Sequence, residues 1–277
     1  MITNVPAVAA HLEAAVRGFA DIAVVGISGG VDSSVVASVC VKALGQESVH
    51  LVSMPYDHVD VSTFNARSAE LAAKLGGHHH IISIGDSCSA IEREIESALG
   101  PAKLDILTYA NVRPRVRMNV LYSFSGELGI RSKKRARVLG TGHLSEDLIG
   151  YDTKGGDALA DLFILSDLVK SEVYQLAKHY GVPESIQDAE PSAGLYRGQT
   201  DFQELGFTYD ELEPATLALY RAIKRGLDVP ELNTSLDEFR GLEQKHVEFV
   251  VSRFKTHFHK HRAPLTVDIR RDQWFDR

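Results

Sequence analysis

Cysteine is scarce in this sequence of 277 residues, which contains only Cys40 and Cys88. The two do not form a C-x-x-C pair, so the sequence predicts neither a zinc site nor a disulfide framework. Cys40 falls in an apolar helical run, where a buried thiol is expected. Such sparing use of cysteine fits a reducing compartment, and we expect a cytoplasmic protein.

Long apolar runs and an excess of positive charge are also missing. No stretch approaches the roughly 18 consecutive apolar residues of a membrane span, and the first 20 residues lack the apolar core of a signal peptide. The 37 acidic side chains outnumber the 30 basic ones, which gives a net charge of −7. A field of this sign does not attract nucleic acid or a membrane surface, so small anionic substrates need local basic groups.

What the sequence does contain is an alternation of short apolar runs and helical segments. The continuous apolar run at 22–27 indicates a strand that is buried on both faces. This order predicts an α/β fold: a doubly wound, mostly parallel sheet with helices on both faces, in a single domain over 1–277. We expect further strands at 49–54, 81–84 and 136–140, helices at 5–19, 35–44, 62–75, 86–99, 111–129, 168–180, 209–225 and 235–256, and a basic loop at 131–137.

The strongest local motif is G-I-S-G-G-V-D-S-S at 26–34, between the first strand and its helix. Two glycines let the backbone turn tightly and present N–H groups to an anion, and the helix adds its positive N-terminal end. Ser28 and Ser33 add hydroxyl donors. Asp32 is itself an anion, so we expect it to hold a Mg²⁺ that bridges phosphate oxygens. The plainer interpretation is that Asp32 or Ser33 only caps the helix.

This motif is neither a Walker loop, which needs G-K-[ST], nor a dinucleotide G-x-G-x-x-G. It resembles the S-G-G-x-D-S signature of the ATP pyrophosphatases, which cleave ATP between the α and β phosphates. The resemblance implies an adenine nucleotide alpha hydrolase-like fold and a loop that holds the departing pyrophosphate. The ATP-binding residues that it implies are Gly26, Ile27, Ser28, Gly29, Gly30, Val31, Asp32 and Ser33.

Other segments resemble the ammonia-dependent NAD synthetase family, in order and at its spacing, over nearly the whole chain. N-V-R-P-R-V-R-M at 111–118 is similar to the family's N-x-x-A-R-x-R-M, which implies that Arg115 contacts deamido-NAD. G-T-G-H-L-S-E at 140–146 is similar to G-T-x-x-x-x-E. That match implies that Thr141 contacts ATP and that Glu146 joins Asp32 on Mg²⁺.

The segment G-Y-D-T-K-G-G-D-A-L-A-D at 150–161 resembles the family's G-[FY]-x-T-K-x-G-D-x-x-A-D. The match implies that Tyr151, Lys154 and Asp161 bind deamido-NAD. The family's L-x-K and P-[TS] elements and its H-K tail also have counterparts here. These counterparts imply ATP contacts for Lys170 and Ser192, and deamido-NAD contacts for His259 and Lys260.

The resemblance implies a ligase that uses ATP and Mg²⁺ to amidate deamido-NAD with ammonia. An adenylated intermediate forms, and AMP and pyrophosphate are released. It also implies a homodimer with the substrate site at the interface. Glutamine-using members carry an added amidohydrolase domain with a cysteine nucleophile. We expect no such domain in this chain, and therefore ammonia as the donor.

Two alternatives stay open. The first is a related ATP pyrophosphatase that amidates a different carboxylate or nucleoside. A tRNA substrate is disfavoured by the net charge, and a GMP-synthetase type of substrate leaves Lys154, Asp161 and the His259–Lys260 pair unexplained. The second is an ATP-binding module without catalysis, which would not need both Asp32 and Glu146 as metal ligands.

Overall fold

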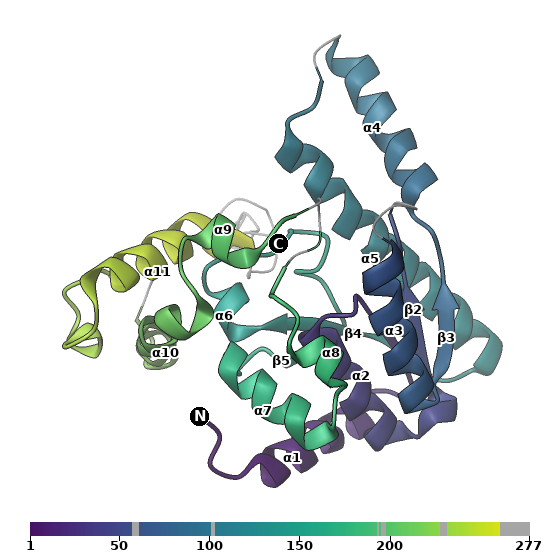
Figure 1. Ribbon diagram of the computed structural model, residues 1–277, viewed down its shortest axis with the longest axis horizontal. Coiled ribbons are helices and arrows are strands. Elements are labelled where there is room, and N and C mark those ends of the chain that lie inside the picture. Colours follow the sequence, from purple (N-terminus) through teal and green to yellow (C-terminus); the bar gives the residue numbers. More distant parts are fainter. Residues whose placement is uncertain (57–60, 101–102, 193, 195–197, 228–231, 261–277) are drawn as a thin grey trace, which may run out of the picture.

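A five-stranded sheet, all of whose strands are parallel, forms the centre of the computed structural model (Figure 1). The structure describes residues 1–56, 61–100, 103–192, 194, 198–227 and 232–260. The strand order is β3-β2-β1-β4-β5, so β1 is central. The strands are β1 (Ile22–Gly26), β2 (Val49–Ser53), β3 (His78–Ile81), β4 (Ala136–His143) and β5 (Leu162–Leu165).

Helices cover both faces of this sheet and extend beyond its edge. They are α1 (Val5–Phe19), α2 (Val31–Leu44), α3 (Val61–Leu75), α4 (Gly85–Leu99), α5 (Ile106–Ser132), α6 (Leu144–Asp147), α7 (Lys170–Tyr180), α8 (Glu184–Gln187), α9 (Asp201–Leu205), α10 (Tyr209–Lys224) and α11 (Gln244–His257), with short 3₁₀ turns η1 (Gln46–Ser48), η3 (Asp237–Phe239) and η4 (Phe258–Lys260).

The chain reverses its direction of travel across the sheet between β1 and β4. From β1 it moves outward to β2 and β3, and then returns to the other side of β1 through β4 and β5. Ile22 pairs with Ala136, and Val25 pairs with Leu139. Ligands bind at such a switch point because loops diverge there at the carboxyl ends of the strands. The motifs at 26–34 and 140–146 both lie at that edge.

Three apolar clusters hold the layers together. One lies between the sheet and α1, α2, α3 and α7, and a second lies between the opposite face and α4 and α5. The third joins α6, α10 and α11 and lies outside the sheet. Helix α2 is buried along most of its length, and its serines Ser34 and Ser38 donate to the Gly30 and Ser34 carbonyls of the same helix, at 2.7 Å each.

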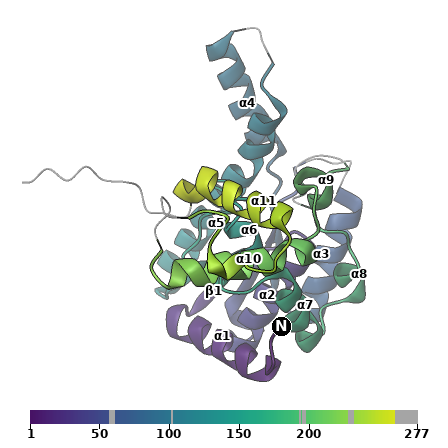
Figure 2. The same cartoon turned by 90° about the vertical axis from the view of Figure 1, so that its left-hand side faces the viewer.

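Helix α4 and the first turns of α5 project from the body of the molecule (Figure 2). We call residues 85–100 and 103–112 the arm. Its base is anchored by Cys88 and Val112, which are buried in the second cluster. Farther out, Leu99, Ile106 and Leu107 expose 75%, 60% and 62% of their surface.

The predicted fold class is confirmed, and most predicted elements are present within a few residues. Five expectations were wrong in their bounds. The third strand is 78–81 and not 81–84, and the last helix begins at Gln244 and not at 235. The helices predicted to begin at 35 and 111 begin at Val31 and Ile106. The predicted basic loop at 131–137 is shortened because α5 continues to Ser132 and β4 begins at Ala136. The short strand β5 had not been predicted.

Both cysteines are free and buried, as expected for Cys40. Burial raises the pKa of the Cys40 thiol to about 12. Within the described residues, no helix combines the length and the apolar character that a membrane crossing requires.

Candidate functional site

A cavity of about 850 Å³ opens at the carboxyl edge of the sheet. The loop at 26–33 forms one wall. The rest comes from the ends of β2 and β4, from α3, α5 and the start of α7, from Glu146 and Asp157, and from residues 186, 189–192, 194 and 198–200. All eight residues predicted to form the ATP loop line this cavity. So do the other three ATP-site candidates, Thr141, Lys170 and Ser192.

The loop at the centre of this wall is held in a tight turn by its own hydroxyl groups. Gly29 has a φ of +78°, a conformation that suits glycine. The Ser33 hydroxyl donates to the Gly30 carbonyl at 3.1 Å and accepts from the Ser28 backbone N–H at 3.3 Å. The N-terminus of α2 therefore faces the cavity, where its backbone N–H groups could bind an anion. Asp32 is the second residue of α2, and its side chain bonds Lys170 rather than capping the helix.

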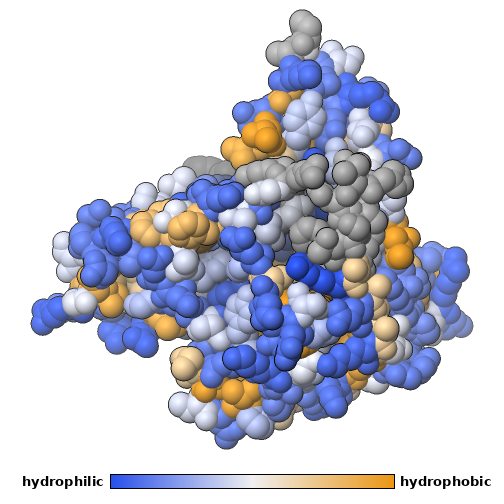
Figure 3. Space-filling view, in the orientation of Figure 1, coloured by the Kyte–Doolittle hydropathy of each residue, from blue (hydrophilic) through white to orange (hydrophobic). Residues whose placement is uncertain are grey.

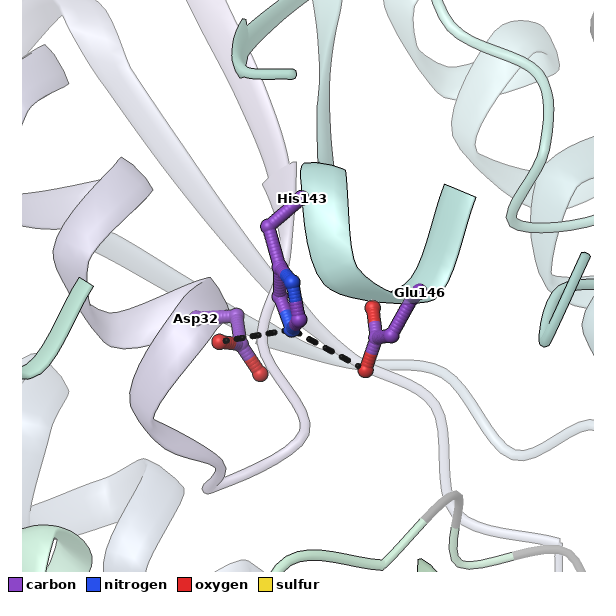
Figure 4. A group of neighbouring side chains, drawn as sticks. All are labelled: Asp32, His143 and Glu146. Atoms are coloured by element: carbon purple, nitrogen blue, oxygen red, sulfur yellow. Dashed lines mark ion pairs between the residues drawn. The ribbon is translucent and has the colours of Figure 1, made fainter. Parts of the chain in front are cut away.

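Three side chains meet beside this loop and could hold a metal ion (Figure 4). His143 Nε2 lies between two carboxylates, 3.6 Å from Asp32 Oδ1 and 3.3 Å from Glu146 Oε1. All three donor atoms lie within 4.8 Å of one another. Carboxylate oxygens are the ligands that Mg²⁺ prefers, and imidazole is a ligand for several divalent metals. The residues present therefore fit a divalent cation.

Lys170 completes this group from the first turn of α7. Its Nζ donates to both Asp32 oxygens, at 2.9 and 2.8 Å, and lies 3.3 Å from His143 Nε2. Burial by itself would raise the pKa of Asp32, but the Lys170 and His143 charges outweigh burial and lower it. Burial likewise works against protonation of His143, but Glu146 and Asp32 raise its pKa above the ordinary value.

A second layer of polar groups lies behind Glu146. Tyr209 donates to Asp201 Oδ2 at 2.9 Å and lies 3.5 Å from Glu146 Oε1. Tyr151 donates to Asp201 as well, at 3.2 Å, and to Glu204. These bonds tie α6 to α9 and α10, and so connect the site to the third apolar cluster.

The six residues predicted to bind deamido-NAD do not line the cavity. Four of them adjoin one another: Arg115 Nε donates to the Lys154 carbonyl at 3.2 Å, Lys154 Nζ donates to the His259 carbonyl at 3.2 Å, and Lys260 follows His259. Lys260 Nζ donates to the Gly150 and Asp152 carbonyls at 2.7 and 2.6 Å. The structure thus brings the tail and the glycine-rich loop together on the surface.

Tyr151 and Asp161 differ from those four. Tyr151 is half-buried, and its hydroxyl is already bonded to two carboxylates, as described above. Asp161 accepts a hydrogen bond from the Val138 backbone N–H at 2.8 Å, which ties it to the middle of β4. Neither side chain is presented to the cavity.

Two arginines of the 111–118 motif that do line the cavity, Arg113 and Arg117, were not among the predicted site residues. Arg117 Nε donates to the Met54 carbonyl at 3.3 Å, and burial lowers its pKa. The Arg113 guanidinium lies 3.7 Å from the centre of the Tyr56 ring, and its buried Nε has no hydrogen-bond partner among the described residues. The signal was available, because residues 113 and 117 share one face of a helix while 115 lies on another.

Two further carboxylates near Glu146 were also missed. Burial and the Glu146 charge raise the pKa of Asp147 to about 7. Burial, Asp152 and Glu146 raise the pKa of Asp157 to about 6, against the hydrogen bond from Thr153. Asp157 lines the cavity. Clustered acids with raised pKa values are common at functional sites, because burial and neighbouring like charges disfavour the ionised form there.

The sequence matches the family model described as NAD synthase over residues 7–264. The NH(3)-dependent NAD(+) synthetase of Pyrococcus furiosus is 38% identical to this chain over 244 residues, which cover 87% of this chain and 86% of that protein.

Solved structures agree with the fold described above. A structure of NMN synthetase from Francisella tularensis superposes with a TM-score of 0.75 and 28% identity, covering 97% of this chain and 100% of that one. The NH3-dependent NAD synthetase of Campylobacter jejuni gives a TM-score of 0.74 at 23% identity, covering 96% and 100%. At the latter identity, the agreement concerns the fold alone.

Proposed function

The chain belongs to the NAD synthase family, and from this premise we infer that it is a ligase that forms NAD from deamido-NAD, ATP and ammonia. The observation that carries this function is the identity of 38% to an ammonia-dependent relative over 86–87% of both proteins. The cavity supports it, because one space is lined by a phosphate-binding loop, two metal-ligand carboxylates and Lys170.

In the proposed reaction, the nicotinate carboxylate attacks the α phosphorus of ATP, and pyrophosphate leaves toward the loop at 28–33. Ammonia then attacks the adenylated carbonyl, and AMP is released. Backbone N–H groups of the loop, the N-terminus of α2 and Lys170 stabilise the negative charge that gathers on the phosphates. Most of the catalysis is therefore positioning and charge stabilisation.

Asp32 and Glu146 would hold Mg²⁺, with His143 beside them at 3.6 and 3.3 Å. When bound, the cation supplies charge neutralisation on the phosphate oxygens. Thr141 and Ser192 line the same cavity and would contact ATP. The Ser192 hydroxyl is oriented by donating to the Gln199 carbonyl at 2.7 Å.

Deamido-NAD would be bound in part by the surface group of Arg115, Lys154, His259 and Lys260. This group lies outside the cavity, which supports a site completed by a second copy of the chain. We propose a homodimer on these grounds. The exposed apolar residues of the arm supply a surface that a second copy could cover.

The test is an assay of purified protein with Mg-ATP and ammonium, with and without deamido-NAD, in which AMP and NAD are quantified together. Equal and substrate-dependent formation of both products is expected. The Asp32→Asn variant should release no AMP, because the metal loses a carboxylate ligand and Lys170 loses its partner. Near-normal turnover of that variant would exclude the metal role.

The mononucleotide analogue of deamido-NAD belongs in the same assay. The similarity to an NMN synthetase, at 28% identity over nearly the whole of both chains, makes it the second candidate substrate. AMP formed only with the mononucleotide would support the proposed reaction but would assign the mononucleotide, and not deamido-NAD, as the substrate. No AMP with either substrate would favour the ATP-binding module.

A further inference from the structure

The ammonium group of Lys170 lies among the atoms that would hold the cation. It is 2.9 and 2.8 Å from the two oxygens of Asp32 and 3.3 Å from His143 Nε2. His143 Nε2 is in turn 3.3 Å from Glu146 Oε1. Both oxygens of Asp32 are therefore already engaged by a positive charge, and His143, which Figure 4 shows between Asp32 and Glu146, is also in contact with it.

We propose that Lys170 and a divalent cation exclude each other at Asp32, so that the chain binds the cation only when ATP phosphates accept Lys170. The cation and the nucleotide then bind cooperatively, and the free enzyme does not accumulate metal. This inference rests on the proposed ATP and cation site, and it adds an order to the binding steps.

Charge is the first reason for this exclusion. A divalent ion bound to Asp32 and Glu146 would lie within a few ångströms of Nζ, where like charges repel strongly in a buried site. Lys170 exposes only 4% of its surface. Its ammonium group is held directly against the Asp32 carboxylate, at 2.9 and 2.8 Å from the two oxygens.

The second reason is that Lys170 needs a new partner before it can leave Asp32. A buried ammonium without a counter-ion is strongly disfavoured. The start of α7 is fixed, since the Lys170 backbone N–H donates to Ser145 Oγ at 3.1 Å, so only the flexible side chain can move. Lys170 and the loop at 28–33 line the same cavity, so phosphate oxygens bound by that loop lie within its reach.

Binding of Mn²⁺, a paramagnetic substitute for Mg²⁺, tests the proposal without any turnover. Electron paramagnetic resonance would measure free and bound Mn²⁺ in the absence of nucleotide. We expect Lys170→Met to bind Mn²⁺ at least about tenfold more tightly than the wild type, a coupling of ordinary size between linked sites. The matched control is Lys178→Met, on the exposed side of the same helix, which should behave as the wild type.

The double variant Lys170→Met with Asp32→Asn locates the effect, because it should lose the added affinity. Equal Mn²⁺ affinity of the wild type and Lys170→Met would overturn the proposal, and so would tight binding that survives in the double variant. If Lys170→Met does not fold, Lys170→Gln removes the same charge and keeps a hydrogen-bond donor.

The wild type alone gives an independent measurement. Mn²⁺ by itself should leave Tm unchanged, whereas Mn²⁺ with a non-hydrolysable ATP analogue should raise it, because only the bound state is stabilised. A rise in Tm with Mn²⁺ alone, absent in Asp32→Asn, would contradict exclusion. None of these measurements requires amidation, so failure to form NAD would leave this result interpretable.

Discussion

Arg113, Arg115 and Arg117 alternate with single residues along α5 but face different surroundings. Arg113 and Arg117 line the cavity, whereas Arg115 is exposed and bonds the Lys154 carbonyl. Family resemblance singled out Arg115 alone. The helical repeat of 3.6 residues explains the division, because positions 113 and 117 lie one turn apart.

Replacing Arg113 by Met should weaken ATP binding. A hydrogen bond to a charged group contributes about 1.5–3 kcal/mol, so we expect the KM for ATP to rise roughly tenfold or more. Arg115→Met is the matched control and should raise the KM for deamido-NAD while leaving the KM for ATP unchanged. Steady-state kinetics with each substrate varied would measure both, and the reverse pattern would reassign the two arginines.

The predicted residues at 26–33 line the cavity, and the motif that pointed to them coincides with a strand end. A glycine turn between a buried strand and a helix favours anion binding, because backbone N–H groups and the helix N-terminus face the same point. His143 was missed inside a recognised motif. A histidine offers no sign in the sequence that it is fully buried between two carboxylates contributed by different elements.

At the scale of elements, the contact between the end of α11 and the glycine-rich loop depends on Gly150. Gly150 has a φ of +61°, and a Cβ added there would lie 2.2 Å from His257 Cβ. Lys260 donates to the Gly150 carbonyl. The loop and the helix end can therefore approach each other only when residue 150 has no side chain.

Gly150→Ala should destabilise the protein and disturb the surface group formed by Arg115, Lys154, His259 and Lys260. The positive φ costs about 1–2 kcal/mol, and displacement of His257 adds roughly 1–3 kcal/mol of overpacking. Gly155→Ala has a φ of +76° and nothing within 4 Å, so it should show the first cost only. Urea unfolding compares the two variants, and equal losses would mean that the His257 contact is unimportant.

The strand β3 was misplaced in prediction because its residues are histidines. His50 of β2 stacks on His78 and His80, with ring centres 4.8 and 5.2 Å apart, and His50 Nδ1 lies 3.0 Å from His80 Nε2. The apolar residue that suggested a strand, Ile81, is 64% exposed. Neutral imidazoles here act as flat aromatic surfaces against Phe124, which hydrophobic periodicity does not detect.

This stack makes stability depend on pH. Burial, followed by the His78 and His80 charges, lowers the pKa of His50 from 6.5 to about 4. The unfolded chain therefore takes up a proton first as the pH falls, and stability is lost between pH 6.5 and about 4. The side chain is only partly buried, so we expect a fraction of the roughly 1.4 kcal/mol per pH unit that one fully coupled proton gives.

His50→Phe should flatten that part of the pH dependence, because phenylalanine can stack but cannot be protonated. Urea unfolding at several pH values between 4 and 6.5 would show it. His11→Phe, at an exposed position of α1, serves as the control and should leave the slope unchanged. An unaltered slope in His50→Phe would show that other groups carry the acid sensitivity.

At the scale of the whole molecule, the arm has few neighbours in a single chain. It extends away from the sheet (Figure 2), and some apolar surface is visible on it in Figure 3. Its exposed apolar residues include Leu99, Ile106 and Leu107. Exposed apolar surface on a projecting element marks an interaction site more often than an accident of composition. Nothing in helical periodicity predicted the projection, since Pro101 and its neighbours looked like an ordinary break between two helices.

We expect the wild type to be a dimer in solution and Leu107→Glu to shift it toward monomer. The side chain is 62% exposed, so a charge there should leave the fold of one chain intact and disturb only an interface. Ile130→Glu changes an equally apolar position, 75% exposed, at the other end of α5 and should remain dimeric. Light scattering after gel filtration would report the mass of each, and a monomeric wild type would contradict the dimer.

The global fold was easier to predict than its surface geometry. The continuous apolar run at 22–27 predicts a strand buried on both faces, and such strands are typical of a parallel sheet between helical layers. The third apolar cluster, which α6, α10 and α11 share, was not predicted. The pattern of an amphipathic helix shows that one face is buried, but it does not show which element covers that face.

Helix α2 has almost no side that meets solvent, and its serines satisfy their hydroxyls within the helix. The glycine-rich loop that begins at Gly26 is therefore attached to a helix that is buried along most of its length in the first apolar cluster. Heat would inactivate the enzyme when this cluster opens and not when surface segments loosen. An engineer seeking a higher operating temperature would gain more by improving packing around α2 than by stiffening the outer loops.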